Sequence, residues 1–266
     1  VDSIHPALLT SYRLIIASFI LLFFCNFVKI KKLFKHNKKD LIIIALIGNV
    51  LPFNLISWSQ LYVDSLVAST LIGTMPLFTL LISFNFFKNR FKNQTIYGLA
   101  FGFIGMIIFL KPNHQSIIDK NLFFSLLIIL SSILYAFSAN WVKTVKESSS
   151  FELACCSIGV AAFFSIPLSI FLFFIGDNEI SSMLLNITLK SFISASFLGV
   201  LCTGLAISIF FKLIEIRSAV FASQSNYLIP CFGFLWSYIF LEEMFTLNLM
   251  VGFILIVFGG FLVNRQ

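Results

Sequence analysis

The chain has 266 residues, of which 59% are hydrophobic and only 11% are charged. A globular domain in water has about 25% charged residues, so this composition excludes a soluble protein and indicates one whose solvent is the lipid bilayer. The formal charge of +7 does not indicate a nucleic-acid partner, because the basic residues lie between apolar stretches and form no continuous surface.

Nine stretches are apolar and long enough to cross a bilayer, for which a helix needs about 20 residues. Helices are expected because an open sheet leaves backbone groups without hydrogen-bond partners in lipid. The sequence therefore predicts an all-α integral membrane protein with nine transmembrane helices. The predicted spans are 5–28, 41–63, 65–87, 94–110, 121–142, 150–175, 191–211, 218–241 and 246–263.

The loops between these spans differ in charge when they are assigned alternately to the two sides of the membrane. One side receives fourteen of the eighteen Lys and Arg residues, the other receives Lys111, Lys120 and Lys190, and Arg13 lies within the first span. Cytoplasmic loops collect Lys and Arg. We therefore expect a multi-pass membrane protein with its C-terminus in the cytoplasm.

An internal repeat appears when the sequence is shifted by 154 residues. The shift pairs Ala68 with Ala222, Ser69 with Ser223, Pro76 with Pro230, Gly98 with Gly252 and Gly105 with Gly259. It leaves span 121–142 without a mate, so we expect two five-helix repeats, at 1–115 and 116–266, of which the first lacks its opening helix. An odd number of helices per repeat inverts the second copy, as in many transporters.

Several stretches resemble the EamA-type carriers of the drug/metabolite transporter superfamily. The similarity lies in Ala68-Ser69, in Pro76-Leu77-Phe78-Thr79 and in Leu241 to Thr246 followed by Gly252 and Gly259. Pro6, Leu8, Leu9 and Arg13 are similar to the second helix of the family, and Leu134-Tyr135-Ala136 to the start of its second repeat. The resemblance implies ten helices in two inverted repeats and transport of small metabolites, often amino acids or related compounds, across the bacterial inner membrane. The acidic motif of the family is present as Glu242-Glu243 but reads Lys88-Asn89 in the first repeat.

Polar residues and prolines inside the spans are the candidates for a solute site. Proline frees a backbone carbonyl within a helix, and such carbonyls are tolerated in lipid where they line a wet cavity or are buried in protein. We therefore expect helix breaks at Pro76 and Pro230. The polar candidates for a solute cavity are Asn54, Ser57, Trp58, Tyr135, Gln224 and Asn226. Hydrogen bonding between helices as packing is the alternative.

Arg13 is the only charged residue within an apolar span. A charge in this position indicates a functional role by default. We expect Arg13 to attract a carboxylate or phosphate of the solute. The alternative is a side chain that extends to the membrane surface.

No catalytic, metal-binding or cofactor-binding motif is recognisable. The five cysteines lie in apolar stretches without C-x-x-C spacing, and the three histidines lie at helix ends or in loops, so we do not expect an enzyme. All eleven acids lie at span ends or in loops. The sequence thus favours a facilitator or exchanger that works by alternating access, with a small-molecule solute and the lipid bilayer as partners. A proton-coupled exporter and a membrane subunit or scaffold without transport activity are the alternatives.

Overall fold

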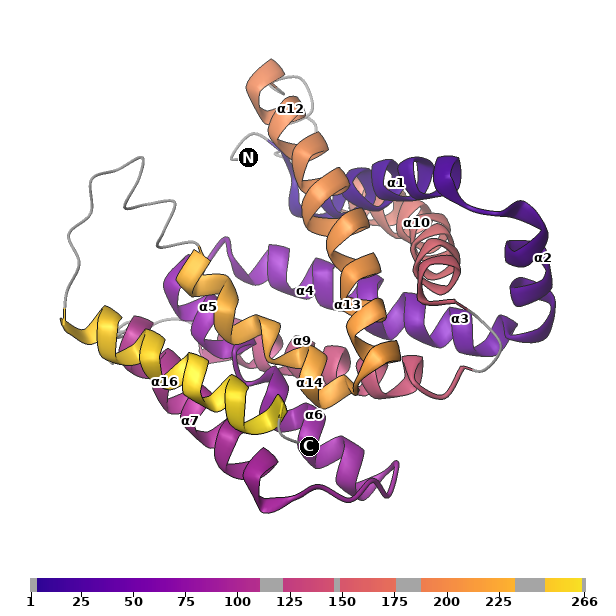
Figure 1. The fold of residues 1–266 in the computed structure, drawn as a ribbon. Helices are drawn as coiled ribbons and strands as arrows, with labels where there is room; N and C mark the ends of the chain where they lie inside the picture. The colour runs from indigo at the N-terminus through magenta and orange to yellow at the C-terminus, as the bar shows by residue number, and fades with distance from the viewer. Residues whose placement is uncertain (1–3, 111–121, 146–148, 176–187, 233–246, 265–266) are drawn as a thin grey trace. The chain divides into compact units, whose positions relative to one another are not determined.

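The computed structural model describes residues 4–110, 122–145, 149–175, 188–232 and 247–264. Every regular element in these ranges is a helix (Figure 1). In the first half they are α1 (Pro6–Phe24), α2 (Phe27–His36), α3 (Lys38–Ala45), η1 (Leu46–Val50), α4 (Leu51–Ser59), α5 (Ser65–Ile72), α6 (Met75–Asn85) and α7 (Asn93–Leu110). In the second half they are α9 (Leu122–Val142), α10 (Ser150–Ile175), α12 (Leu189–Phe197), η2 (Leu198–Leu205), α13 (Ala206–Ile216), α14 (Ala219–Ser223) and α16 (Leu247–Asn264).

Eight of the nine predicted spans are confirmed as helices that are long and apolar enough to cross a membrane. They are Pro6–Phe24, Lys38–Ser59, Val67–Asn85, Asn93–Leu110, Leu122–Val142, Ser150–Phe171, Leu189–Ile216 and Leu247–Asn264. The remaining prediction, 218–241, lies partly outside the described residues. Its described part is helical over 219–223 and again over 225–232.

The segment between the first two spans is a helix, α2, where the sequence indicated only a basic loop. The Asn26 side chain caps this helix by accepting hydrogen bonds from the backbone N–H groups of Val28 and Lys29. Phe27 and Phe34 are exposed apolar side chains on α2, and Lys31 and Lys35 are exposed basic ones. The helix is therefore amphipathic, and its ten residues are too few to cross a bilayer.

The chain forms two compact units. Unit 1 contains 1–58 and 141–216, and unit 2 contains 59–140 and 217–266. Each unit takes helices from both halves of the sequence. A repeat in sequence need not pack as one compact body. The division into repeats at 1–115 and 116–266 stays a prediction.

Unit 1 is built around α1 and α10. The Ser11 hydroxyl donates to the carbonyl of Ser165 over 2.9 Å, and the Ser169 hydroxyl donates to the carbonyl of Ala7 over 2.9 Å. Further along, Ser18 faces Gly159, so α1 and α10 run antiparallel. Small side chains at the contact let the helices approach closely. The buried core of the unit consists of Leu14, Ala17, Leu21, Ala45, Val50, Cys155, Ile158, Ala161 and Ala162.

Unit 2 is built around α7 and α16. A Cβ atom added to Gly98 would lie 2.6 Å from the carbonyl oxygen of Gly259, and one added to Gly105 would lie 2.8 Å from that of Gly252. The two helices are therefore antiparallel and touch through their backbones at four glycines. The buried side chains around this contact include Leu99, Met106, Tyr227, Ile256 and Val263.

Large apolar side chains remain exposed on many of these helices. Phe23 is 85% exposed, Phe163 is 71% exposed and Phe84 is 60% exposed. A soluble protein rarely exposes such a surface over a large area. In a membrane protein these side chains contact lipid, which agrees with the low charge content of the chain.

Candidate functional site

Two π-helical segments in unit 1 interrupt the spans that contain them. They are η1 and η2, and each has a polar side chain at an equivalent position. The Asn49 amide donates to the Ile44 carbonyl over 3.4 Å, and the Thr203 hydroxyl donates to the Leu198 carbonyl over 3.0 Å. Both bonds reach back five residues, which is the π-helical spacing, and both partners are related by the 154-residue shift.

A second pair of hydrogen bonds follows the same shift. The Asn54 amide donates to the Val50 carbonyl over 2.8 Å, and the Ser208 hydroxyl donates to the Gly204 carbonyl over 2.8 Å. Side chains therefore satisfy carbonyls of the irregular turns in both segments, as nonpolar surroundings require. π-helical turns are frequent at functional sites, so these two segments are the first part of the candidate site.

The Arg13 side chain reaches η2 from α1. Its Nε and Nη2 atoms donate to the hydroxyl of Thr203 over 3.3 and 3.2 Å, and its guanidinium lies 4.8 Å from the ring centroid of Phe53. Thr203 is fully buried, and its hydroxyl donates a hydrogen bond to the Leu198 carbonyl. The guanidinium is thus held inside unit 1 by a hydroxyl and an aromatic face, about 10 Å along the helix from Pro6.

The other predicted residues of unit 1 lie on α4. Asn54 and Ser57 are half-buried, and Trp58 is 46% exposed. The structure brings Phe53, the neighbour of Asn54, to Arg13. Asn54 uses its amide donor on its own helix, which fits the packing interpretation and leaves its amide oxygen available.

The predicted helix break near Pro76 is present in unit 2, but it lies just before the proline. Gly73 and Thr74 form a turn between α5 and α6, and Pro76 stands in the first turn of α6, where no backbone donor is required. The Leu71 carbonyl at this break accepts from the hydroxyls of Thr74 and Ser132, over 2.6 and 3.2 Å.

The predicted polar residues near the second break also lie in unit 2. The Asn226 amide donates to the Met75 sulfur over 3.0 Å and to the Ser223 carbonyl over 2.9 Å. Gln224 is 9% exposed, and its Nε2 atom has no hydrogen-bond partner. A buried amide without a partner is costly, which distinguishes Gln224 from residues that serve packing alone. The turn here falls at Gln224, and Pro230 lies in the helical stretch 225–232. Tyr135 is half-buried on α9.

Sequence reasoning missed Asn49, Thr203 and Thr10. Thr10 is fully buried on α1 and its hydroxyl has no hydrogen-bond partner. Single hydroxyl or amide groups in apolar runs are common and carry little signal. The signal that was present is the repeat itself, because the 154-residue shift places polar Asn49 on polar Thr203 in the middle of two spans.

Comparison with known proteins gives the family. The model of the EamA-like transporter family matches residues 1–111 and 122–265. The chain belongs to this family. The resemblance found in the sequence is therefore confirmed, and the protein is a membrane transporter of the EamA type.

The chain is similar to several proteins named as transporters. It is 39% identical over 107 residues to an "Uncharacterized transporter in trpA 3'region" of Buchnera aphidicola subsp. Schlechtendalia chinensis, which covers 40% of this chain and 33% of that protein. It is 24% identical over 265 residues to the uncharacterized transporter YoaV of Bacillus subtilis (strain 168), covering 98% of this chain and 88% of that one. It is 30% identical over 158 residues to an S-adenosylmethionine uptake transporter of Rickettsia bellii (strain RML369-C), covering 54% and 53%.

A solved crystal structure shares the fold. It superimposes with a TM-score of 0.77 at 13% sequence identity and covers 98% of this chain and 87% of the other.

Proposed function

We propose that this protein carries a small metabolite with a carboxylate group, an amino acid or a compound such as S-adenosylmethionine, across the bacterial inner membrane. The observation that carries the proposal is Arg13. A charge placed at the centre of a transmembrane helix costs about 2.5–3.5 kcal/mol, and a chain that only needed packing would not retain it. The guanidinium is fixed by Thr203 and Phe53, which is the arrangement needed to hold an Arg in place for a carboxylate.

The proposed solute class draws on one relative and one feature of the site. The relative of Rickettsia bellii is named for uptake of S-adenosylmethionine, a molecule with an α-amino acid group and therefore a carboxylate. Arginine recognises carboxylates through paired N–H donors. Amino acids and S-adenosylmethionine share this group, so both belong to the predicted class.

We further propose that the transporter consists of two inverted repeats that work by alternating access. Two matched pairs of side-chain hydrogen bonds in unit 1 follow the 154-residue shift, and these support the repeat. The shift relates α7 to α16, and these two helices run antiparallel at their glycine contact, which supports inversion. The π-helical segments are the positions where such spans could bend, since they already depart from regular helix.

Energy coupling is proposed to be that of a facilitator or solute exchanger. Four acids lie in the described residues, and all four are at ends of candidate spans: Asp40, Asp64, Glu152 and Glu215. A proton carrier in a membrane is usually a carboxylate that desolvation keeps partly protonated. The described part of the chain therefore offers no such carboxylate at mid-membrane depth, which favours exchange over proton coupling.

The experiment is uptake of radiolabelled S-adenosylmethionine and amino acids into proteoliposomes that contain the purified protein. We expect saturable uptake that is accelerated by unlabelled solute inside. Arg13→Gln should raise KM about tenfold to a hundredfold, because a charge-assisted hydrogen bond is lost. Arg13→Lys should retain part of the affinity, and Lys190→Gln is the matched loss of one positive charge outside the site.

Two outcomes would contradict these proposals. Unchanged kinetics in both Arg13→Gln and Arg13→Leu would remove Arg13 from the solute site. Accumulation that follows an imposed pH gradient at clamped membrane potential, and that disappears in Glu243→Gln, would replace the exchanger by a proton-coupled carrier.

A further inference from the structure

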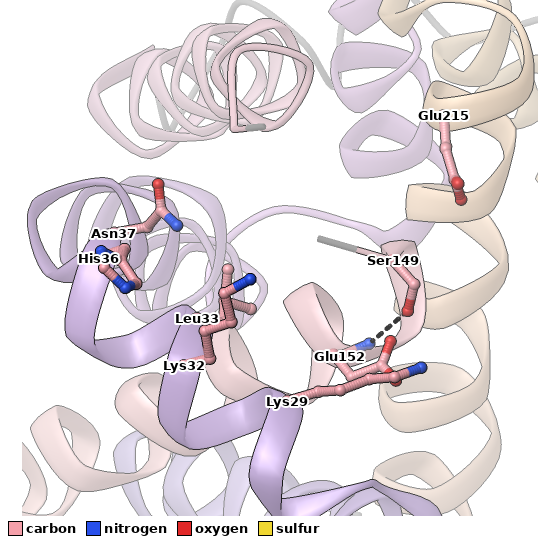
Figure 2. A pocket seen from close by; sticks show the side chains of 8 residues that line it. All are labelled: Lys29, Lys32, Leu33, His36, Asn37, Ser149, Glu152 and Glu215. Atoms are coloured by element: carbon pink, nitrogen blue, oxygen red, sulfur yellow. Dashed lines mark hydrogen bonds and ion pairs between the residues drawn. The ribbon is translucent and has the colours of Figure 1, made fainter. Parts of the chain in front are cut away.

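A cavity of about 530 Å³ lies in unit 1, away from the candidate solute site. Its walls come from α2 and from the ends of α10 and α13 (Figure 2). This volume is within the usual range for small-molecule sites, about 300–1,000 Å³. None of the residues identified as solute-site candidates lines it.

The two walls of the cavity differ in charge. Lys32 and His36 lie on the α2 side, whereas Glu152 and Glu215 lie on the opposite side, and the Lys29 side chain reaches across from α2 to Glu152 (Figure 2). The spacing of the three α2 residues places them on one helical face. A ligand that fills the cavity therefore meets cationic donors at one end and carboxylates at the other, which suits a molecule with an anionic and a cationic group.

Glu152 has an unused acceptor at this cavity. The residue is 8% exposed, and its Oε1 atom lies 3.4 Å from the Lys29 ammonium. Its Oε2 atom is buried and has no hydrogen-bond partner. A buried carboxylate oxygen without a partner is costly, and a ligand ammonium that donates to Oε2 would remove this cost.

The other charged groups of the cavity are not equivalent. Glu215 is already paired with Lys212 over 3.0 Å on the exposed side of α13. Lys32 has no ion-pair partner within the described ranges. An incoming anion would therefore bind at Lys32, with His36 as the adjacent donor, and an incoming cation at Glu152.

The cavity lies at the ends of candidate membrane spans. It lies where candidate spans Pro6–Phe24 and Leu189–Ile216 end and where Lys38–Ser59 and Ser150–Phe171 begin. These ends carry the Lys-rich segments that place them on the predicted cytoplasmic side. The phosphate layer of a bilayer begins at the ends of its spanning helices.

Helix α2 also exposes apolar side chains beside the cavity. Phe27 is 68% exposed and Phe34 is 42% exposed, and they lie seven residues apart on one helical face. Lys31 and Lys35 follow on the adjoining face. An amphipathic helix of this kind lies in the membrane surface with its apolar face toward the acyl chains. The residues that line the cavity are therefore at the level of the lipid headgroups.

We propose that this cavity binds the headgroup of a zwitterionic aminophospholipid, with its phosphate at Lys32 and His36 and its ammonium at the Oε2 atom of Glu152. The site selects a primary ammonium, as in phosphatidylethanolamine, because its N–H groups can donate to Oε2. A choline headgroup has no N–H donor, and a glycerol headgroup has no cation.

The experiment is native mass spectrometry of the purified full chain with an equimolar mixture of phosphatidylethanolamine, phosphatidylcholine and phosphatidylglycerol. We expect the wild-type protein to retain phosphatidylethanolamine about tenfold over the other two. Glu152→Gln should bring this preference close to one. Lys32→Gln should lower retention of all three lipids while it leaves the preference in place.

Two variants control the interpretation. Lys29→Gln breaks the ion pair with Glu152 but keeps the Oε2 acceptor, so it should keep the preference for phosphatidylethanolamine. Lys31→Gln removes a charge of the same helix outside the cavity and should behave as wild type. If Glu152→Gln does not fold, as judged by size-exclusion chromatography, Lys32→Gln against Lys31→Gln still decides the site, because Lys32 has no packing role at the exposed α2 surface.

Equal retention of the three lipids by the wild-type protein, or an unchanged preference in Glu152→Gln, would overturn the proposal. Soluble O-phosphoethanolamine provides the remaining test, in protein reconstituted in phosphatidylcholine alone. Saturable stabilisation of the protein by micromolar O-phosphoethanolamine would assign the cavity to a soluble phosphorylated amine and overturn the lipid assignment. Absence of such stabilisation is the result expected for a lipid.

Discussion

The contact between α7 and α16 predicts that two neighbouring glycines respond differently to the same substitution. Gly259 faces α7, and an added Cβ atom would lie 2.7 Å from the amide nitrogen of Gly102. Gly260 faces away, and its added Cβ atom would lie 3.7 Å from its nearest neighbour, the Oε1 atom of Gln224. Gly259→Ala therefore requires a backbone movement, and Gly260→Ala requires none.

The expected difference follows from this geometry. An ordinary contact begins at 3.4 Å, and the carbonyl oxygen of Gly98 is nearer still than the Gly102 nitrogen, so at Gly259 the helices must separate by more than about 0.7 Å along a contact made of backbone atoms. Overpacking of this kind costs about 1–3 kcal/mol. Both substitutions gain the same helix propensity, about 1 kcal/mol, so the difference between the two variants isolates the cost of separation. We expect Gly259→Ala to be less stable than Gly260→Ala by about 1–3 kcal/mol.

The assay is equilibrium unfolding in mixed detergent micelles, followed by circular dichroism, with both variants and wild type at the same protein concentration. Gly98→Ala, whose Cβ atom would meet the Gly259 carbonyl at 2.6 Å, should resemble Gly259→Ala. Equal stability of Gly259→Ala and Gly260→Ala, within about 0.5 kcal/mol, would refute the backbone contact between the two helices.

Three further predictions concern unit 1. Thr203→Val should destabilise the protein by about 1–3 kcal/mol because it removes the partner of Arg13 and of the Leu198 carbonyl. Thr10→Val should be neutral or stabilising because the Thr10 hydroxyl is unpartnered. Thermal unfolding of both valine variants measures these effects, and a larger loss of stability at Thr10 would contradict the prediction. Burial raises the pKa of the Cys25 thiol, with the Glu152 charge in the same direction and a hydrogen bond with Cys155 opposing. Less thiolate is then present at neutral pH. In a variant with Cys25 as its only cysteine, iodoacetamide should therefore label the folded protein more slowly than the unfolded protein. Equal labelling rates would speak against burial. A cysteine placed at Lys35 should react with a membrane-impermeant maleimide only after the cells are permeabilised. A cysteine placed at Lys190 should react in intact cells. The reverse pattern would invert the predicted topology.

Much of the architecture could be predicted from the sequence because hydrophobicity acts locally in a membrane. A span is recognised from its own residues, so eight helices were found at nearly their observed places, and the family was recognised from short motifs within them. The break near Pro76 was also predicted, although the turn itself falls at Gly73 and Thr74. Helix α2 was missed because its apolar face is short and its lysines resemble those of a loop.

The candidate site was predicted only in part. Arg13 stood out because a charge inside an apolar run is visible in the sequence. Its partner Thr203 is 190 residues away, and a single hydroxyl among apolar residues gives no local signal.

Only the tertiary structure decided which distant residues meet. The repeat aligned Gly98 with Gly252, but the fold brings Gly98 to Gly259 and Gly252 to Gly105, because helices related by the shift pack antiparallel. Lys29 and Glu152 had no relation in the sequence, but in the fold they form an ion pair and both line the cavity beside α2. The composition and order of the chain determine which segments enter the bilayer. The contacts between segments depend on how complementary surfaces fit in three dimensions, and no local pattern in the chain encodes that fit.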